Sequence, residues 1–197
     1  MTLFYLIRHG QHEVQDRIMV GRAPGIRLSE RGRGEAERAA TRLAAENIEA
    51  LYRSPQERAA ETARPIAERL ELEPLVAPEL DEIDVGAWTN LAVADLERDA
   101  GFARFNSFRS GTPAPEGEWM LDVQRRVVGL IERLRRERPG CRVALVSHGD
   151  PIKAAVLYYL GMPLDLFPRI EVSTGSISRL EVEEWGPRVV GLNEVPA

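Results

Sequence analysis

The sequence predicts an α/β fold, a three-layer α/β/α sandwich built on a mostly parallel central sheet. Two apolar runs, 3–7 and 143–146, carry no charge and indicate strands buried on both faces. Strand and helix patterns alternate along the chain, an order typical of parallel sheets with crossover helices. Such sheets bind ligands at the carboxyl ends of their strands, where these two runs lead into His9 and His148.

The first half of the chain predicts two strand–helix units. Ser29 is expected to cap a helix that runs to about residue 47, because small apolar residues recur there at helical spacing. A short strand is expected at 48–52. Ser54 and Pro55 predict the next helix, as its N-cap and first residue, and Pro65 is expected to kink that helix or end it early.

The second half begins with a short strand at 75–77. From 79 to 118 the pattern weakens to one short helix at 91–98 among glycine, proline and aromatic residues, which predicts a lid over the site. The further expected elements are a helix at 119–138, the strand at 143–146, a helix from Asp150 to about Gly161, and strands at 177–182 and 189–192. The 197 residues are expected to form a single domain.

Composition narrows the class of protein. A hydrophobic content of 44% with 29% charged residues is typical of ordinary globular proteins. The net charge of −5 argues against nucleic acid or an anionic membrane as partner, because both require a positive surface. Cys141 is the only cysteine, which fits a reducing compartment, and no apolar run is long enough for a signal peptide or a membrane span. We therefore expect a cytoplasmic protein.

Two of the three histidines share one local pattern, in which a buried strand is followed by His-Gly and a turn. One such histidine alone would indicate a turn hydrogen bond, but His9 and His148 at the same sheet edge favour a shared site. Arg8 precedes His9, and Arg58 lies one turn into a predicted helix. Guanidinium groups match phosphate oxygens in geometry, and helix N-termini attract anions. These residues predict a site for a compact dianion.

Six blocks of the sequence, in order, resemble the histidine phosphatase superfamily, which includes cofactor-dependent phosphoglycerate mutase. The blocks are residues 6–11 (LIRHGQ), 28–32 (LSERG), 54–63 (SPQERAAETA), 80–88 (LDEIDVGAW), 115–118 (PEGE) and 146–149 (VSHG). Each block alone is a weak or moderate match, but together they cover nearly the whole chain. The resemblance implies a phosphoglycerate mutase-like fold.

The resemblance also implies a role for each matched residue. His9 would be the nucleophile that forms a phosphohistidine. Arg8, Arg58 and His148 would bind the phosphoryl oxygens and stabilise the transition state. No metal and no cofactor are implied, and the sequence has no metal-binding motif.

Other site positions follow from the same resemblance. Glu82 would protonate the leaving oxygen and then activate water; Asp84 is the alternative, since any acid in this segment is also compatible with a solvated turn. Gln15, where many members have asparagine, and Gly149 are expected to contact the phosphoryl group or substrate. His12 stands where serine or threonine is common, and is expected at the pocket rim or on the surface.

The short chain resembles the phosphatase branch, so we expect hydrolysis of a small phosphorylated metabolite. The alternatives are mutase-type phosphoryl transfer and a phosphate-binding or interaction module without catalysis. Arg104 and Arg109 lie among aromatic residues of the predicted lid. Our hypothesis is that these two arginines contact a second anionic group or a ring of the substrate. The sequence is also compatible with a homodimer.

Overall fold

A mixed six-stranded sheet forms the centre of the computed structural model, which describes all 197 residues. The strands are β1 (Thr2–Arg8), β2 (Ala50–Arg53), β3 (Pro74–Val76), β4 (Arg142–Ser147), β5 (Ile177–Val182) and β6 (Pro187–Glu194). Their order across the sheet is β3-β2-β4-β1-β5-β6. Strands β1 to β4 are parallel, whereas β5 pairs antiparallel with β1 and with β6. The predicted, mostly parallel α/β architecture is confirmed.

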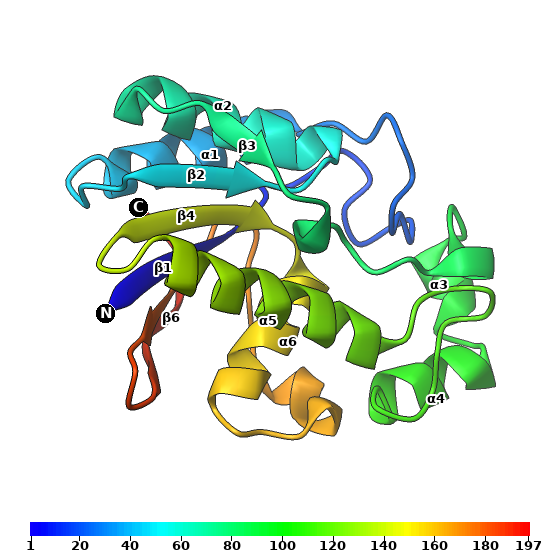
Figure 1. Ribbon diagram of the computed structural model, residues 1–197. Helices are drawn as coiled ribbons and strands as arrows, with labels where there is room; N and C mark the ends of the chain where they lie inside the picture. The colour runs from blue at the N-terminus through cyan, green and yellow to red at the C-terminus, as the bar shows by residue number, and fades with distance from the viewer.

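Helices cover both faces of this sheet (Figure 1). They are α1 (Glu30–Leu43), α2 (Glu57–Leu70), α3 (Val93–Leu96), α4 (Ala100–Ser107), α5 (Met120–Glu137) and α6 (Gly149–Tyr159), with 3₁₀ turns at Pro78–Leu80, Gly86–Trp88 and Leu164–Arg169. Alternate residues of β1 enter two cores: Tyr5 and Ile7 pack with α1 and α2, while Phe4 and Leu6 pack with α5 and α6. None of the helices combines the length and the apolar character needed to cross a bilayer.

Helix α1 begins as predicted and ends earlier. The Ser29 side chain accepts a hydrogen bond from the backbone N–H of Gly32 at 3.1 Å, which confirms it as the N-cap. The helix ends at Leu43 instead of near residue 47, because the chain turns toward β2 through Asn47 in a left-handed conformation (φ 48°).

One prediction for α2 is wrong, and of the kink or early end predicted at Pro65 the structure excludes the early end. The N-cap of α2 is Gln56 and not Ser54, whose buried hydroxyl lies 2.7 Å from Nε2 of His148. Pro65 does not end the helix, which continues to Leu70. Packing of the apolar face, including Ala63 and Ile66, offsets the hydrogen bond that proline removes.

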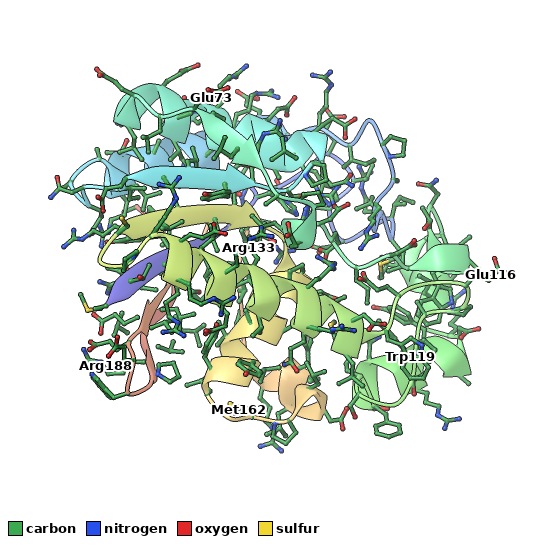
Figure 2. The ribbon with its side chains drawn as sticks, in the orientation of Figure 1. Glu73, Glu116, Trp119, Arg133, Met162 and Arg188 are labelled. Carbon is green, nitrogen blue, oxygen red and sulfur yellow. The ribbon has the colours of Figure 1, made fainter.

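The segment 79–118 forms the short elements α3 and α4 and two 3₁₀ turns. Helix α3 is shorter than the predicted 91–98, and α4 was not expected. Trp88 packs edge-on against Phe102 and Phe105, with ring centroids 5.3 and 5.2 Å away. Figure 1 shows this segment beyond the carboxyl ends of β2 and β4, and Glu116 and Trp119 mark the same end in Figure 2, opposite Arg188. The segment therefore lies at the sheet edge where the site is expected, and its action as a lid stays a prediction.

Candidate active site

The register of the sheet brings two histidines together. Arg8 of β1 pairs with Ser147 of β4, so the next residue of each strand, His9 and His148, emerges at the same edge. The two imidazole centroids are 5.0 Å apart and the ring planes are inclined at 62°. Both side chains are buried. The separation allows one small anion to contact both rings.

The surroundings of His9 select one tautomer and one protonation state. Its Nδ1 lies 2.7 Å from the carbonyl oxygen of Gly10, which can only accept, so Nδ1 carries the proton and the lone pair is on Nε2. Burial, together with the charges of Arg58 and Arg8, lowers the pKa of His9 well below its usual value. His9 is therefore a neutral imidazole whose Nε2 lone pair accepts only a long hydrogen bond, from Nε of Arg58 at 3.4 Å, and an unprotonated Nε2 is the form required of a nucleophile.

A close backbone approach holds this turn in place. A Cβ on Gly10 would stand 2.3 Å from the carbonyl oxygen of Gly32, so no larger residue fits without movement. The Gly10 N–H donates to Oγ1 of Thr62 on α2, which in turn donates to the carbonyl of Arg58. The nucleophile turn and the arginine-bearing helix are thus connected directly.

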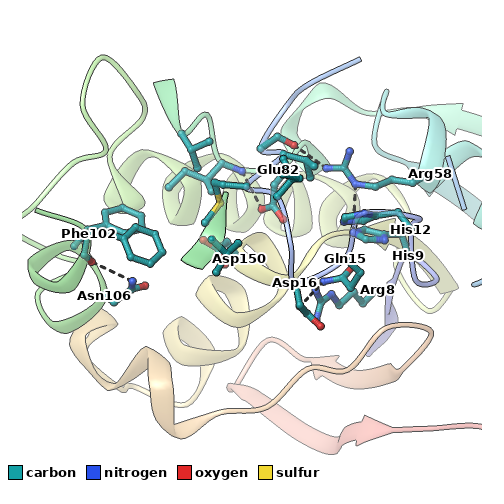
Figure 3. A pocket seen from close by; sticks show the side chains of 18 of the residues that line it. Arg8, His9, His12, Gln15, Asp16, Arg58, Glu82, Phe102, Asn106 and Asp150 are labelled. Carbon is teal, nitrogen blue, oxygen red and sulfur yellow. Dashed lines mark hydrogen bonds between the residues drawn. The ribbon is translucent and has the colours of Figure 1, made fainter. Parts of the chain in front are cut away.

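Two arginines flank the His9 ring (Figure 3). Arg58, 1% exposed, donates through Nη2 to the carbonyl of Gly21 at 2.8 Å, and its Nε lies 3.4 Å from Nε2 of His9. Arg8 donates through Nη1 to the carbonyl of Val172 at 2.6 Å. Nη1 of Arg58 and Nε of Arg8 are buried and have no partner. Because unpaired buried donors are costly, this arrangement favours a bound anion.

His148 lies behind His9 at the start of α6. Nε2 of His148 is bound to the Ser54 hydroxyl, whereas Nδ1 is buried without a partner. Burial and the charge of Arg58 lower its pKa well below the usual value. Gly149 packs against the Arg8 guanidinium, since a Cβ there would lie 3.5 Å from Arg8 Nε. Neither His148 nor Gly149 lines the open cavity, so any contact they make is with an anion seated deeply against His9.

A cavity of about 180 Å³ opens in front of His9. Arg8, His9 and Arg58 line its inner end. Phe102 and Asn106 of α4 belong to the outer wall, which brings the segment 79–118 over the site (Figure 3). The cavity therefore has a cationic inner end and a mixed aromatic and polar outer end.

Glu82 lines this cavity and Asp84 does not. Burial, and then the charge of Asp150, raises the pKa of Glu82 to about 7, although Arg58 opposes the shift. Figure 3 shows Glu82 between Asp150 and Arg58. Asp84 instead accepts a hydrogen bond from the backbone N–H of Gly86 at 2.9 Å. The geometry therefore favours Glu82 as the acid of the site.

The other side chains singled out in the sequence divide between those that line the cavity as expected, Gln15 and Arg109, and those that lie elsewhere than expected, His12 and Arg104. His12 is neither at the surface nor exposed at the rim: it is 5% exposed and forms part of the cavity wall. Gln15 lines the cavity, with Nε2 bound to Asp16 and Oε1 unpartnered. Of the two arginines predicted to contact substrate, Arg109 lines the cavity, whereas Arg104 is exposed outside it.

Sequence reasoning also missed Asp150, which it treated only as the start of a helix. Asp150 lines the cavity and binds Arg109, with Oδ2 2.8 Å from Nη1. The guanidinium also stacks on Phe105, 4.1 Å from the ring centroid. The available signal was its position two residues after His148, at the sheet edge where the site was expected. This pair ties the segment 79–118 to the first turn of α6.

Comparisons with known proteins agree with this geometry. The chain is 31% identical to "Phosphoserine phosphatase 1" of Hydrogenobacter thermophilus over 98% of its length and 92% of the relative. It is 30% identical to a "Probable phosphoglycerate mutase" of Cronobacter sakazakii, covering 93% of this chain and 86% of the relative. A mycobacterial glucosyl-3-phosphoglycerate phosphatase, solved in complex with VO3, superposes with a TM-score of 0.89 at 28% identity and 98% coverage of both chains.

The family model described as "Histidine phosphatase superfamily (branch 1)" matches residues 4–195. Its coverage extends from β1 through β6, so the match includes every element that builds the site. Together with the named relatives, the match indicates an enzyme of phosphatase or mutase type. This chain belongs to the histidine phosphatase superfamily, branch 1.

Proposed function

We propose that this protein hydrolyses small phosphomonoesters through a covalent phosphohistidine on His9. The observation that carries the proposal is the neutral His9 imidazole, whose Nε2 lone pair lies beside a buried guanidinium with an unpartnered donor. Relatives named as phosphatases support hydrolysis. The metal-free route and the individual residue roles are part of this proposal.

In the first step, Nε2 of His9 attacks phosphorus in line with the ester oxygen. The N–P bond forms as the P–O bond to the leaving group breaks, and protonated Glu82 transfers its proton to the departing oxygen. Unpartnered donors of Arg8 and Arg58 bind the equatorial oxygens, where charge is spread in the transition state. His148 joins them through Nδ1 in the tautomer in which Ser54 donates to Nε2 and the ring proton is on Nδ1. A buried nucleophile and a raised carboxyl pKa are both required for this step.

In the second step, the Glu82 carboxylate accepts a proton from a water molecule that attacks the phosphohistidine. The N–P bond breaks, inorganic phosphate forms, and His9 returns to its neutral state with Glu82 protonated again. The same guanidinium donors stabilise the second transition state. Acid and base are thus one residue acting in alternate protonation states.

Cavity size points to a compact substrate. A volume of about 180 Å³ is smaller than the roughly 300–1,000 Å³ typical of sites for drug-sized ligands. Phe102 and Phe105 form part of the cavity wall. The relatives' names mention phosphoserine and glucosyl-3-phosphoglycerate, and phosphoserine is the more compact of the two. We therefore propose a phosphorylated metabolite of a few carbon atoms in preference to a nucleotide.

The proposal is tested by assaying the pure protein on a panel of phosphorylated metabolites, with and without a chelator. Release of inorganic phosphate from compact substrates, unchanged by the chelator, is expected. Dependence of 3-phosphoglycerate isomerisation on its 2,3-bisphosphate would establish the mutase alternative suggested by one relative. Loss of turnover with chelator would contradict the metal-free route, and no turnover on any substrate would favour a binding module.

Replacement of Arg58 by alanine is expected to lower kcat/KM by about 10²–10³-fold, the scale for one donor that stabilises transition-state charge. Arg64 is the matched control: it lies on the same helix, its side chain is 69% exposed, and its Arg64→Ala variant should keep wild-type kinetics. Steady-state kinetics on one compact substrate measures both. Equal losses in the two variants would mean that the effect arises from α2 stability and not from the site.

A further inference from the structure

All three histidines of the chain gather in this one site. His12, which the mechanism above does not use, lies with its ring centroid 5.8 Å from that of His9 and its plane tilted by 34°. It is 5% exposed and forms part of the cavity wall. Figure 3 shows the His9 and His12 rings side by side next to Arg58.

The backbone fixes His12 in this position. The residue forms an isolated antiparallel bridge with Leu28, and its carbonyl accepts the N–H of Gln15. Its Nδ1 is shielded from solvent and bonds to nothing. A histidine kept only for packing would normally have its buried ring nitrogen paired. The other buried ring nitrogen without a partner is Nδ1 of His148, which belongs to the same site. The unpaired Nδ1 of His12 therefore indicates that a bound ligand supplies its hydrogen-bond partner.

The charges that face His12 keep it neutral in the free protein. Arg58 on α2 and Arg8 at the end of β1 repel a proton, and only Asp16 in its own loop attracts one. With burial as the largest cause, these charges lower the pKa of His12 to about 4. A phosphoryl dianion bound between the two guanidinium groups would offset their repulsion and favour the imidazolium form.

We propose that His12 contacts the phosphoryl group of the bound substrate and donates a hydrogen bond to one of its oxygens. The proposal rests on the proposed function, which seats that group at Nε2 of His9. When a phosphomonoester monoanion binds, its acidic proton moves to His12, which leaves an imidazolium beside a dianion with no net uptake. When phosphate leaves, it takes that proton back. His12 thus adds a third imidazole to the two predicted from the strand ends.

Nuclear magnetic resonance of the wild-type protein labelled with ¹⁵N-histidine tests this directly, because three side chains give few signals. Titrations from about pH 5 to 8 are compared with and without saturating inorganic phosphate. The His12 signals, assigned from the spectrum of His12→Asn, should be those of a neutral ring alone and of an imidazolium with phosphate. Unchanged His12 signals, with His9 or His148 signals that do respond, would overturn the proposal. No response from any of the three would overturn the proposed function as well.

Two substitutions separate hydrogen bonding from packing. His12→Phe keeps a ring without a donor, and should weaken inhibition by inorganic phosphate by about 10- to 100-fold, the scale for losing one hydrogen bond to a charged group. His12→Asn places an amide N–H near the position of Nδ1, and should keep most of the phosphate affinity. Equal phosphate affinity in His12→Phe and wild type would contradict the proposed contact.

Discussion

His9→Ala is expected to lower kcat by on the order of 10⁶-fold, the scale seen when an enzyme loses its covalent nucleophile. The substitution removes the Nε2 lone pair that lies beside the guanidinium groups, at 3.4 Å from Nε of Arg58. His148 cannot replace it, because its Nε2 is bound to Ser54 and it does not line the cavity. Phosphate release from a compact substrate, measured at high enzyme concentration, checks this result.

Substrate binding supplies the control for that variant. Arg8, Arg58 and His148 remain in His9→Ala, so calorimetry should still show binding of substrate or inorganic phosphate with wild-type stoichiometry. Binding without turnover identifies a chemical defect in a folded site. Turnover within tenfold of wild type would contradict covalent catalysis by His9.

Glu82→Gln is expected to lower kcat/KM by about 10²–10⁴-fold for alkyl phosphates, the usual contribution of a positioned general acid. An aryl phosphate with a good leaving group needs little protonation, so its first step should be affected far less. Asp84→Asn is the matched control, because Asp84 lies outside the cavity and its carboxylate accepts only from the Gly86 backbone N–H. A comparable loss in Asp84→Asn, or an equal loss for both leaving groups, would contradict the assignment of Glu82.

The pH dependence of kcat/KM follows from the same residue. The acid must be protonated in the first step, and burial and Asp150 raise its pKa to about 7, so the active fraction falls as pH rises above that value. Alkyl phosphates should therefore lose about tenfold per pH unit on the alkaline side. Glu82→Gln should lose this limb and keep any limb near pH 6 that belongs to the substrate's second ionisation. If the alkaline limb of the profile persists unchanged in Glu82→Gln, the ionisation behind it belongs to another group.

The arrangement of layers could be predicted from sequence, because apolar strands and amphipathic helices have distinct periods. The meeting of His9 and His148 followed from the same reasoning, since parallel strands end at a common edge. Local rules failed where tertiary contacts competed with them. Ser54 has the residue type of an N-cap, but α2 begins two residues later than expected, and the Ser54 hydroxyl binds His148 as well as the backbone N–H of Gln56. Pro65 is accommodated because α2 is held by its buried face.

Other features of the site depend on which side chains are buried and on the course of the loops, and neither is encoded in a local sequence pattern. The resemblance ranks Glu82 ahead of Asp84, but whether either acid reaches the site depends on the fold, and only Glu82 lines the cavity wall. The burial of His12 depends on the bridge from its loop to Leu28. Arg109 and Arg104 belong to the same aromatic segment, yet only Arg109 reaches Asp150. Which of these side chains reaches the cavity therefore depends on packing between segments that are distant in the chain.

Trapping the phosphoenzyme is the most direct test of a phosphohistidine on His9. Wild-type protein is mixed rapidly with an aryl phosphate, quenched in alkali, digested and mapped by mass spectrometry. We predict one phosphoryl group per chain, labile to acid and stable to alkali, on Nε2 of His9. Phosphate on His148 or on a serine hydroxyl, or pre-steady-state turnover without any labelled peptide, would contradict the account.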